Sequence, residues 1–183
     1  MSTTKQQVRE FLDLLGFKYD EPEELDNLFL LFFTTQKYIY KSSDGDKNRV
    51  AVFIEVDEAG EMITFAAPQI YQCPNDADKN NKLALFQSLL EIQYKYKLVR
   101  FTYDPSNGYI ALKVSIPLED TPLTHRMFNR CLKIIPECLD EYHSDIIEAL
   151  NEGLLPESEE AKRKALEEFQ RQRRQQRRNQ FGD

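Results

Sequence analysis

The residues of this chain that could do chemistry are few and lie far apart in the sequence. His125 and His143 are the only histidines, and they are eighteen residues apart. At about 3.6 residues per turn this spacing is five turns of a helix, so the two imidazoles cannot share a metal ion. Polar residues surround His125. Ordinary surface histidines therefore explain both positions better than metal ligands do.

The cysteines also argue against a reactive centre. Cys73, Cys131 and Cys138 are an odd number and lack the spacing of a metal site. Cys131 and Cys138 fall on the apolar face of an expected helix, where small buried thiols are common. Cys138 and His143 point to different sides of that helix, so they do not form a nucleophile and base pair. Three unpaired thiols and a polar first segment lead us to expect a soluble, cytoplasmic protein.

Two further kinds of site are missing from the sequence. The six glycines occur singly, so they build neither a phosphate-binding loop nor a dinucleotide-binding turn. Asp44, Asp46 and Asn48 alternate around Gly45, but the bidentate glutamate that closes a calcium loop is absent. We therefore predict no catalytic residue, no cofactor and no metal ion, and we predict that the protein is not an enzyme.

The elements that would have to position any such residues are easier to predict. Residues 98–117 alternate between apolar and polar around a turn at 104–108 that contains Asn107 and Gly108, which is typical of a β-hairpin. Apolar residues then recur every three or four positions from Leu123 to Leu150, which predicts a long amphipathic helix. Pro136 lies inside this pattern and should kink or divide the helix.

The first half of the chain predicts a helix at 4–15, strands at 49–56 and 61–66, and a helix starting near residue 83. Pro68 either ends the second of these strands or places it at a sheet edge. Residues 28–33 are apolar on every side and fit a helix end or a doubly covered strand, of which we favour the strand. The order α-β-β-β-α-β-β-α predicts an α+β protein, with an antiparallel five-stranded sheet and helices on one face.

Charge divides the chain into two parts. Residues 1–155, the expected domain, hold 16 Lys and Arg against 25 Asp and Glu, whereas residues 156–183 hold 8 against 6. An acidic body argues against nucleic-acid binding, because contacts to phosphates need clustered cations. The tail, helical or disordered, is either a solvated segment or a contact for an anionic partner through Arg171, Arg173, Arg174, Arg177 and Arg178. The sequence contains no run of about 18 apolar residues, so we expect no membrane span.

Aromatic and aliphatic residues exceed what one face of the expected sheet would bury. These residues either complete the core or form a face that binds a partner protein, and the sequence leaves both interpretations open. The candidate partner-binding residues are Phe29, Leu31, Phe32, Phe33, Tyr38, Tyr40, Tyr103 and Tyr109.

The chain resembles the YbjN domain and the wider type III secretion chaperone-like superfamily. The resemblance is carried by the turn with Asp104, Asn107 and Gly108, by a strand whose end is formed by residues 114–120, and by the helix start at Thr121-Pro122-Leu123. Residues 50–55, 60–65 and 83–90 fit the same order, so the resemblance covers about residues 4–150, and it is strongest to cyanobacterial members.

The resemblance implies a non-enzymatic chaperone or adaptor, often a homodimer, that holds a segment of a client protein on hydrophobic surface. For a cyanobacterial member, the clients would be subunits of large assemblies such as carboxysome shells or photosynthetic complexes. The alternative from the residues alone is a signalling or regulatory protein whose basic tail binds an anionic ligand or nucleic acid.

Overall fold

The computed structural model describes residues 4–22, 27–40, 45, 47–57, 59–118 and 122–155. The described elements, in chain order, are α1 (Lys5–Leu15), β1 (Tyr19–Asp20), β2 (Leu28–Thr34), β3 (Arg49–Val56), β4 (Met62–Gln72), α2 (Lys79–Lys95), β5 (Arg100–Tyr103), β6 (Tyr109–Pro117) and α3 (His125–Glu152). This order confirms the predicted α+β class. The sheet of the described residues has six strands where five were expected, because the two-residue β1 pairs with β2.

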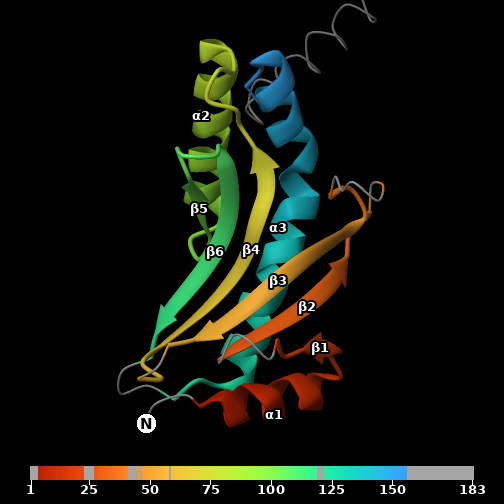
Figure 1. Ribbon diagram of the computed structural model, residues 1–183, viewed down its shortest axis with the longest axis vertical. Helices are drawn as coiled ribbons and strands as arrows, with labels where there is room; N and C mark the ends of the chain where they lie inside the picture. The colour runs from red at the N-terminus through yellow and green to blue at the C-terminus, as the bar shows by residue number, and fades with distance from the viewer. Residues whose placement is uncertain are drawn as a thin grey trace, which may run out of the picture.

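The strands form one antiparallel sheet in the order β1-β2-β3-β4-β6-β5. Helix α3 runs along one face of this sheet, behind β3 and β4 in Figure 1, and α2 lies beside α3. Helix α1 lies near β1, and its Phe11 ring packs 5.5 Å from Phe128 of α3. In the described part of the chain, no helix covers the opposite face of the sheet, as predicted.

Alternation along the strands determines which side chains form the core. In β3, Val50, Val52, Ile54 and Val56 are buried toward α3, and the residues between them point to the other face. Residues 28–33 belong to strand β2, which confirms the favoured assignment; Phe29 and Leu31 are buried there. Because these side chains pack under one long helix, the core is a single layer between sheet and helices.

Helix α3 is continuous through Pro136, so of the two expected outcomes, a kink or a division of the helix, division does not occur. The loss of one backbone hydrogen bond is offset by an uninterrupted buried stripe that includes Phe128, Ile135 and Ile146. Thr124 caps the start, since its hydroxyl accepts the Met127 N–H at 3.2 Å.

Strand β4 is regular in its first half and irregular in its second. It pairs with β3 only over residues 63–66, and its register with β6 shifts between Ala67 and Tyr71. Pro68, Gln69 and Ile70 therefore pair with no strand on either side. Because no ladder needs the missing N–H of Pro68, the strand continues to Gln72 instead of ending at the proline. Figure 1 shows β3 and β4 diverging beyond this point.

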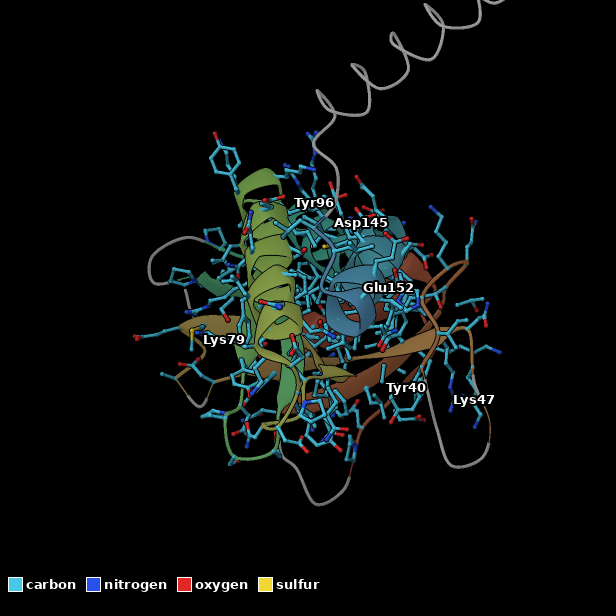
Figure 2. All side chains as sticks on the ribbon, turned by 90° about the horizontal axis from the view of Figure 1, so that it is seen from above. Tyr40, Lys47, Lys79, Tyr96, Asp145 and Glu152 are labelled. Carbon is cyan, nitrogen blue, oxygen red and sulfur yellow. The ribbon has the colours of Figure 1, made fainter. Side chains whose placement is uncertain are left out.

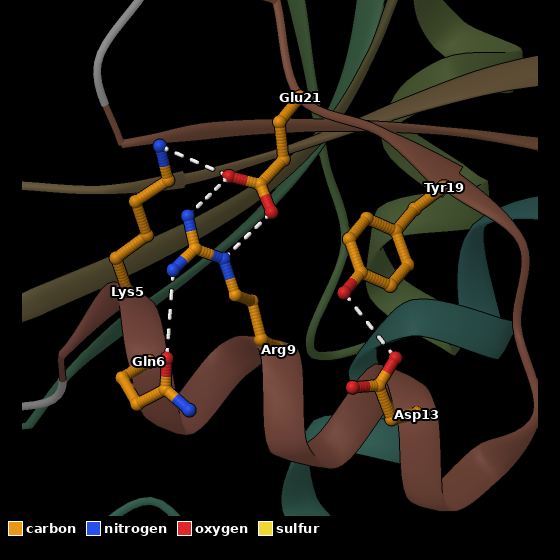
Figure 3. Close-up of polar contacts among 6 residues, drawn as sticks. All are labelled: Lys5, Gln6, Arg9, Asp13, Tyr19 and Glu21. Carbon is orange, nitrogen blue, oxygen red and sulfur yellow. Dashed lines mark hydrogen bonds and ion pairs between the residues drawn. The ribbon is translucent and has the colours of Figure 1, made fainter.

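An ion-pair group fastens α1 to the segment that follows β1 (Figure 3). The guanidinium of Arg9 donates to both carboxylate oxygens of Glu21, at 2.7 and 2.6 Å, and Lys5 Nζ lies 3.1 Å from the same carboxylate. Hydrogen bonding from Arg9, aided by Lys5, outweighs the effect of burial and lowers the pKa of Glu21 to about 2.

The outer edge of β5 is partly closed by a side chain of α2. Strand β5 has four residues and pairs only with β6. On its free side the Phe101 N–H donates to Gln93 Oε1 at 2.6 Å. A backbone donor at this edge is thus already satisfied within the chain.

Candidate functional site

The uncovered face of the sheet carries a contiguous apolar surface, which we call the open-face patch. Leu30 of β2 lies opposite Phe53 of β3, and Phe53 lies opposite Ala66 of β4. All three alternate with buried residues, so they point away from α3. The whole patch comprises Leu28, Leu30, Phe32, Ala51, Phe53 and Ala66.

The same face becomes polar and basic toward β6 and β5. In register with Ala66 stands Lys113, and next to it Arg100. Thr64 and Ser115 share a hydrogen bond of 3.0 Å between their hydroxyls. At the other end of the patch the guanidinium of Arg49 lies 4.7 Å from the centre of the Phe32 ring. Positively charged groups thus lie at two sides of the patch, and the exposed carboxylate of Glu55 lies on the same face, opposite Leu28.

The sequence-predicted partner-binding residues divide by exposure. Phe29, Leu31 and Tyr38 are buried, at 0, 1 and 1 % exposure, so of the two interpretations left open by the sequence these three complete the core and do not lie on a partner-binding face. In β2 the odd-numbered residues face the core, where the Phe29 ring packs 5.7 Å from Tyr19. Of the remaining candidates, Phe32 and Tyr40 are exposed, at 48 and 38 %.

Three candidates are partly buried. Phe33 packs edge-on against Phe17, and Tyr103 packs edge-on against Phe86 of α2. Tyr109 lies at the start of β6, opposite Gln72. A role of these residues in partner binding stays a prediction. Sequence analysis missed Leu30 and Phe53, which strand alternation in 49–56 would have placed on the uncovered face once β2 was known to be a strand.

Tyr38 is held in a polar and aromatic cluster between α3 and β4. Its hydroxyl donates to the Ile70 carbonyl at 3.1 Å, and its ring packs edge-on against Tyr71 and His143. The Tyr71 hydroxyl lies 3.1 Å from His143 Nδ1. Burial raises the pKa of both tyrosines, so both hydroxyls are neutral and serve as hydrogen-bonding groups.

Asp140 of α3 fixes the backbone that carries Tyr38. Its carboxylate accepts the N–H groups of Gln36, Lys37 and Tyr38 at 2.9 to 3.1 Å. Burial is the largest single influence on the pKa of Asp140 and raises it, but the three amides together with His143 outweigh burial and lower the pKa. Asp140 is therefore ionised at neutral pH and anchors the segment after β2 to α3.

The histidines differ from the expected surface residues. His143 belongs to the cluster around Tyr71, and His125 is partly buried with its ring 5.8 Å from Phe11. The three cysteines are buried thiols, and burial raises their pKa values, which disfavours the reactive thiolate. Among the described residues no three His, Cys, Asp or Glu side chains gather as a metal site would require.

Helix α2 presents a second apolar surface opposite its buried side. Leu83, Leu90 and Tyr94 are exposed at 66, 63 and 86 % and lie about one or two turns apart on one helix face. The five tail arginines, Arg171, Arg173, Arg174, Arg177 and Arg178, lie outside the described residues. In the described part of the chain, no helix is both long and apolar enough to cross a membrane.

Comparison with solved structures identifies the fold. The chain is similar to "YbjN, a putative transcription regulator from E. coli", with a TM-score of 0.53 and 14 % identity, over 78 % of this chain and 92 % of that one. No family model matches the sequence, and no curated protein does. The described residues thus have an α+β fold similar to that of YbjN, which confirms the predicted fold.

Two weaker similarities are to proteins solved in complexes. One, at a TM-score of 0.43 and 14 % identity, is to a chain of the "HopA1-SchA Chaperone-Effector Complex" and covers 75 % of this chain and 92 % of that one. The other, at a TM-score of 0.42 and 15 % identity, is to a chain of the "ExsC-ExsE Complex" and covers 77 % of this chain and 96 % of that one.

Proposed function

We propose that this protein is a non-enzymatic chaperone-like adaptor that binds an apolar segment of a partner protein on the open-face patch. The observation that carries the proposal is the line Leu30, Phe53 and Ala66 across three strands of a sheet face that no described helix covers. Contiguous apolar surface on a folded protein marks an interaction site more often than scattered apolar residues do.

The charges around the patch suggest the composition of the partner segment. Arg49 stands at one side of the patch, and Lys113 and Arg100 stand at the other. A segment with apolar side chains at its centre and acidic groups at its ends complements this arrangement. The resemblance to cyanobacterial members suggests a subunit of a carboxysome shell or photosynthetic complex as the client, and a cytoplasmic location.

A homodimer is part of the proposal, with the exposed face of α2 as its candidate interface. Leu83, Leu90 and Tyr94 form a stripe on the side of α2 that faces away from α3. An interface of this kind would leave the open-face patch free for the client. Size-exclusion chromatography with light scattering tests the proposed homodimer: the full chain should have the mass of a dimer, and Leu90→Asp should have the mass of a monomer.

The test of the proposed function is site-specific photo-crosslinking in the native cell. A photoreactive phenylalanine analogue at position 53 is expected to capture a protein partner that the same analogue at position 83 does not. The variant Leu30→Asp should reduce capture from position 53 at least tenfold, because it places a carboxylate in the centre of the patch. Capture that is unchanged in Leu30→Asp, or identical from both positions, would contradict the proposal.

The alternative function, regulation through an anionic ligand bound by the basic tail, depends on residues outside the described part of the chain. Its support is the 8 Lys and Arg among residues 156–183. It predicts binding to a phosphate-rich probe such as heparin that weakens steeply with salt and disappears when residues 170–183 are removed. Removal of these residues should leave crosslinking from position 53 unchanged if the adaptor function is right.

A further inference from the structure

A pocket of about 410 Å³, which we call the cationic pocket, lies at the β5 edge of the sheet. Its walls come from the last turn of α2, the loop between α2 and β5, and the strands β5 and β6. Lys97, Arg100 and Lys113 all line it, and among the described residues no aspartate or glutamate does. Positive charge therefore gathers at this pocket in a chain whose formal net charge is −7.

Two of these cations are held against each other by the strand register. Arg100 of β5 lies directly opposite Lys113 of β6. Residues opposite each other in an antiparallel pair share a face with their Cβ atoms about 4.5–5.5 Å apart, so these like charges repel. Among the described residues, the charged groups of Lys97, Arg100 and Lys113 form no ion pair. An anion bound between them would replace the repulsion with attractive contacts.

Two uncharged side chains add hydrogen-bond donors to the pocket. Gln93 Oε1 accepts the Phe101 N–H at 2.6 Å, and within the described part of the chain the Nε2 group of the same amide has no partner. Ser115 Oγ lies 3.0 Å from Thr64 Oγ1. One of these two hydroxyl hydrogens makes that bond, so the other remains available to a ligand.

The loop that carries Lys97 is fixed by its neighbour Tyr96, which Figure 2 labels between α2 and α3. The Tyr96 ring packs edge-on against Tyr142 of α3 with the ring centres 5.8 Å apart, and its hydroxyl donates to the Glu141 carboxylate. The Val99 N–H donates to the Tyr96 carbonyl at 3.2 Å. Lys97 therefore extends from an ordered backbone, which lowers the entropy that a ligand loses by ordering its site.

Charge and size together restrict the ligand. A carboxylate carries one negative charge, whereas a phosphate monoester carries about −1.5 to −2 at pH 7 and has three acceptor oxygens. The planar guanidinium of Arg100 matches two such oxygens. The volume exceeds what a phosphate group alone fills and lies within the range of about 300–1,000 Å³ of small-molecule sites. Leu98, which is 42 % exposed, offers apolar surface to an organic group.

From these observations we infer that the cationic pocket binds the phosphate group of a small phosphate monoester. Lys97, Arg100 and Lys113 neutralise the phosphate, and the amide and hydroxyl donors complete its hydrogen bonds. This site goes beyond the proposed function. Because Arg100 and Lys113 also border the open-face patch, a bound phosphate competes there with an acidic group of a client. The test below contains no client, so its result is independent of the proposed function.

The test uses phenyl phosphate, inorganic phosphate and benzoate as probes, with binding to the full, nitrogen-15-labelled chain followed by NMR. We expect phenyl phosphate to bind at least tenfold more tightly than benzoate and at least as tightly as inorganic phosphate. It should shift the signals of the Gln93 side-chain amide and of Arg100 Nε–H. The peptide acetyl-Ala-phosphoserine-Ala-amide represents the other source of a phosphate monoester, a modified protein, and should bind no more tightly than phenyl phosphate.

Three exposed cations of the same formal charge locate the site. Arg100→Gln and Lys113→Gln should each weaken the binding of phenyl phosphate at least fivefold, whereas Lys79→Gln, at the start of α2, should change it less than twofold. The inference is overturned if phenyl phosphate does not bind at millimolar concentration, if benzoate binds equally well, or if Lys79→Gln weakens binding as much as Arg100→Gln. A phosphoserine peptide that binds at least tenfold more tightly than phenyl phosphate would overturn the assignment to a small molecule.

Discussion

Replacement of Asp140 tests how the segment that carries Tyr38 is held in place. The carboxylate accepts three consecutive backbone N–H groups, those of Gln36, Lys37 and Tyr38. Asp140→Ala removes all of these hydrogen bonds at once, and no other side chain is shown to accept from these amides. The change should therefore loosen the backbone between β2 and β3 without touching the sheet.

The magnitude follows from the number and exposure of the bonds. A hydrogen bond to a charged group contributes about 1.5–3 kcal/mol, but such contributions are not additive. The amides of Gln36 and Lys37 are exposed and can form hydrogen bonds with water instead. The amide of Tyr38 is part-buried, so its unsatisfied N–H accounts for most of the lost stability. We expect Asp140→Ala to lower the free energy of unfolding by about 2–4 kcal/mol, and Asp140→Asn by about half as much.

The loss of stability in Asp140→Ala should become smaller as the pH falls. Because the pKa of Asp140 is lower in the folded protein than in the unfolded chain, its contribution is complete above the unfolded value of about 3.9. It is lost as the pH falls through the folded pKa. The difference in stability between the natural protein and Asp140→Ala should therefore be larger at about pH 5 than at a pH below about 4.

Urea denaturation followed by circular dichroism measures both effects. Glu148→Ala is the matched control, since it removes one carboxylate from an exposed position of the same helix and should change stability by less than about 0.5 kcal/mol. If Asp140→Ala were no more destabilising than Glu148→Ala, or if its effect were the same at pH 3 and pH 7, the proposed anchoring would be refuted.

Three other positions give predictions with separate readouts. Gly108→Ala should destabilise by more than about 2 kcal/mol in urea, because its Cβ would lie 2.3 Å from a carbonyl oxygen; Gly16→Ala, with a similar φ and open space, should cost only about 1 kcal/mol. Glu21 should titrate by NMR near pH 2, and Arg9→Gln should move its pKa toward 4.5. Gln69→Gly should raise the melting temperature by relieving the positive φ, and an unchanged or lower value would argue against strain there.

Local patterns in the sequence were sufficient for most of the fold. Alternation in residues 49–56 and 98–117 predicted β3, β5 and β6, and the spacing of apolar residues predicted α3. Strand β1 was missed because two residues have no periodicity to detect. The sequence left open whether Pro136 divides α3, because the low helix propensity of proline allows a break, whereas packing of the whole stripe on the sheet keeps the helix continuous.

The candidate site was less predictable because it depends on register between strands. An apolar run such as residues 28–33 does not show which residues face the core, and the choice of Phe29 and Leu31 as surface residues failed for this reason. The pairing of Leu30 with Phe53 joins residues far apart in the chain. Pro68 was expected to end the strand or to place it at a sheet edge, and both expectations are wrong, because β4 continues to Gln72 and lies between β3 and β6. The local irregularity that accommodates the proline required coordinates.

The contact between Gln93 and the Phe101 N–H has a consequence for a protein with much exposed apolar surface. A free outermost strand would let copies of the chain stack edge to edge into fibres. With the amide oxygen of Gln93 seated on that donor, at 2.6 Å, the end of the sheet is a poor template for growth. Gln93 thus makes this edge of the sheet less available for edge-to-edge stacking between copies of the chain.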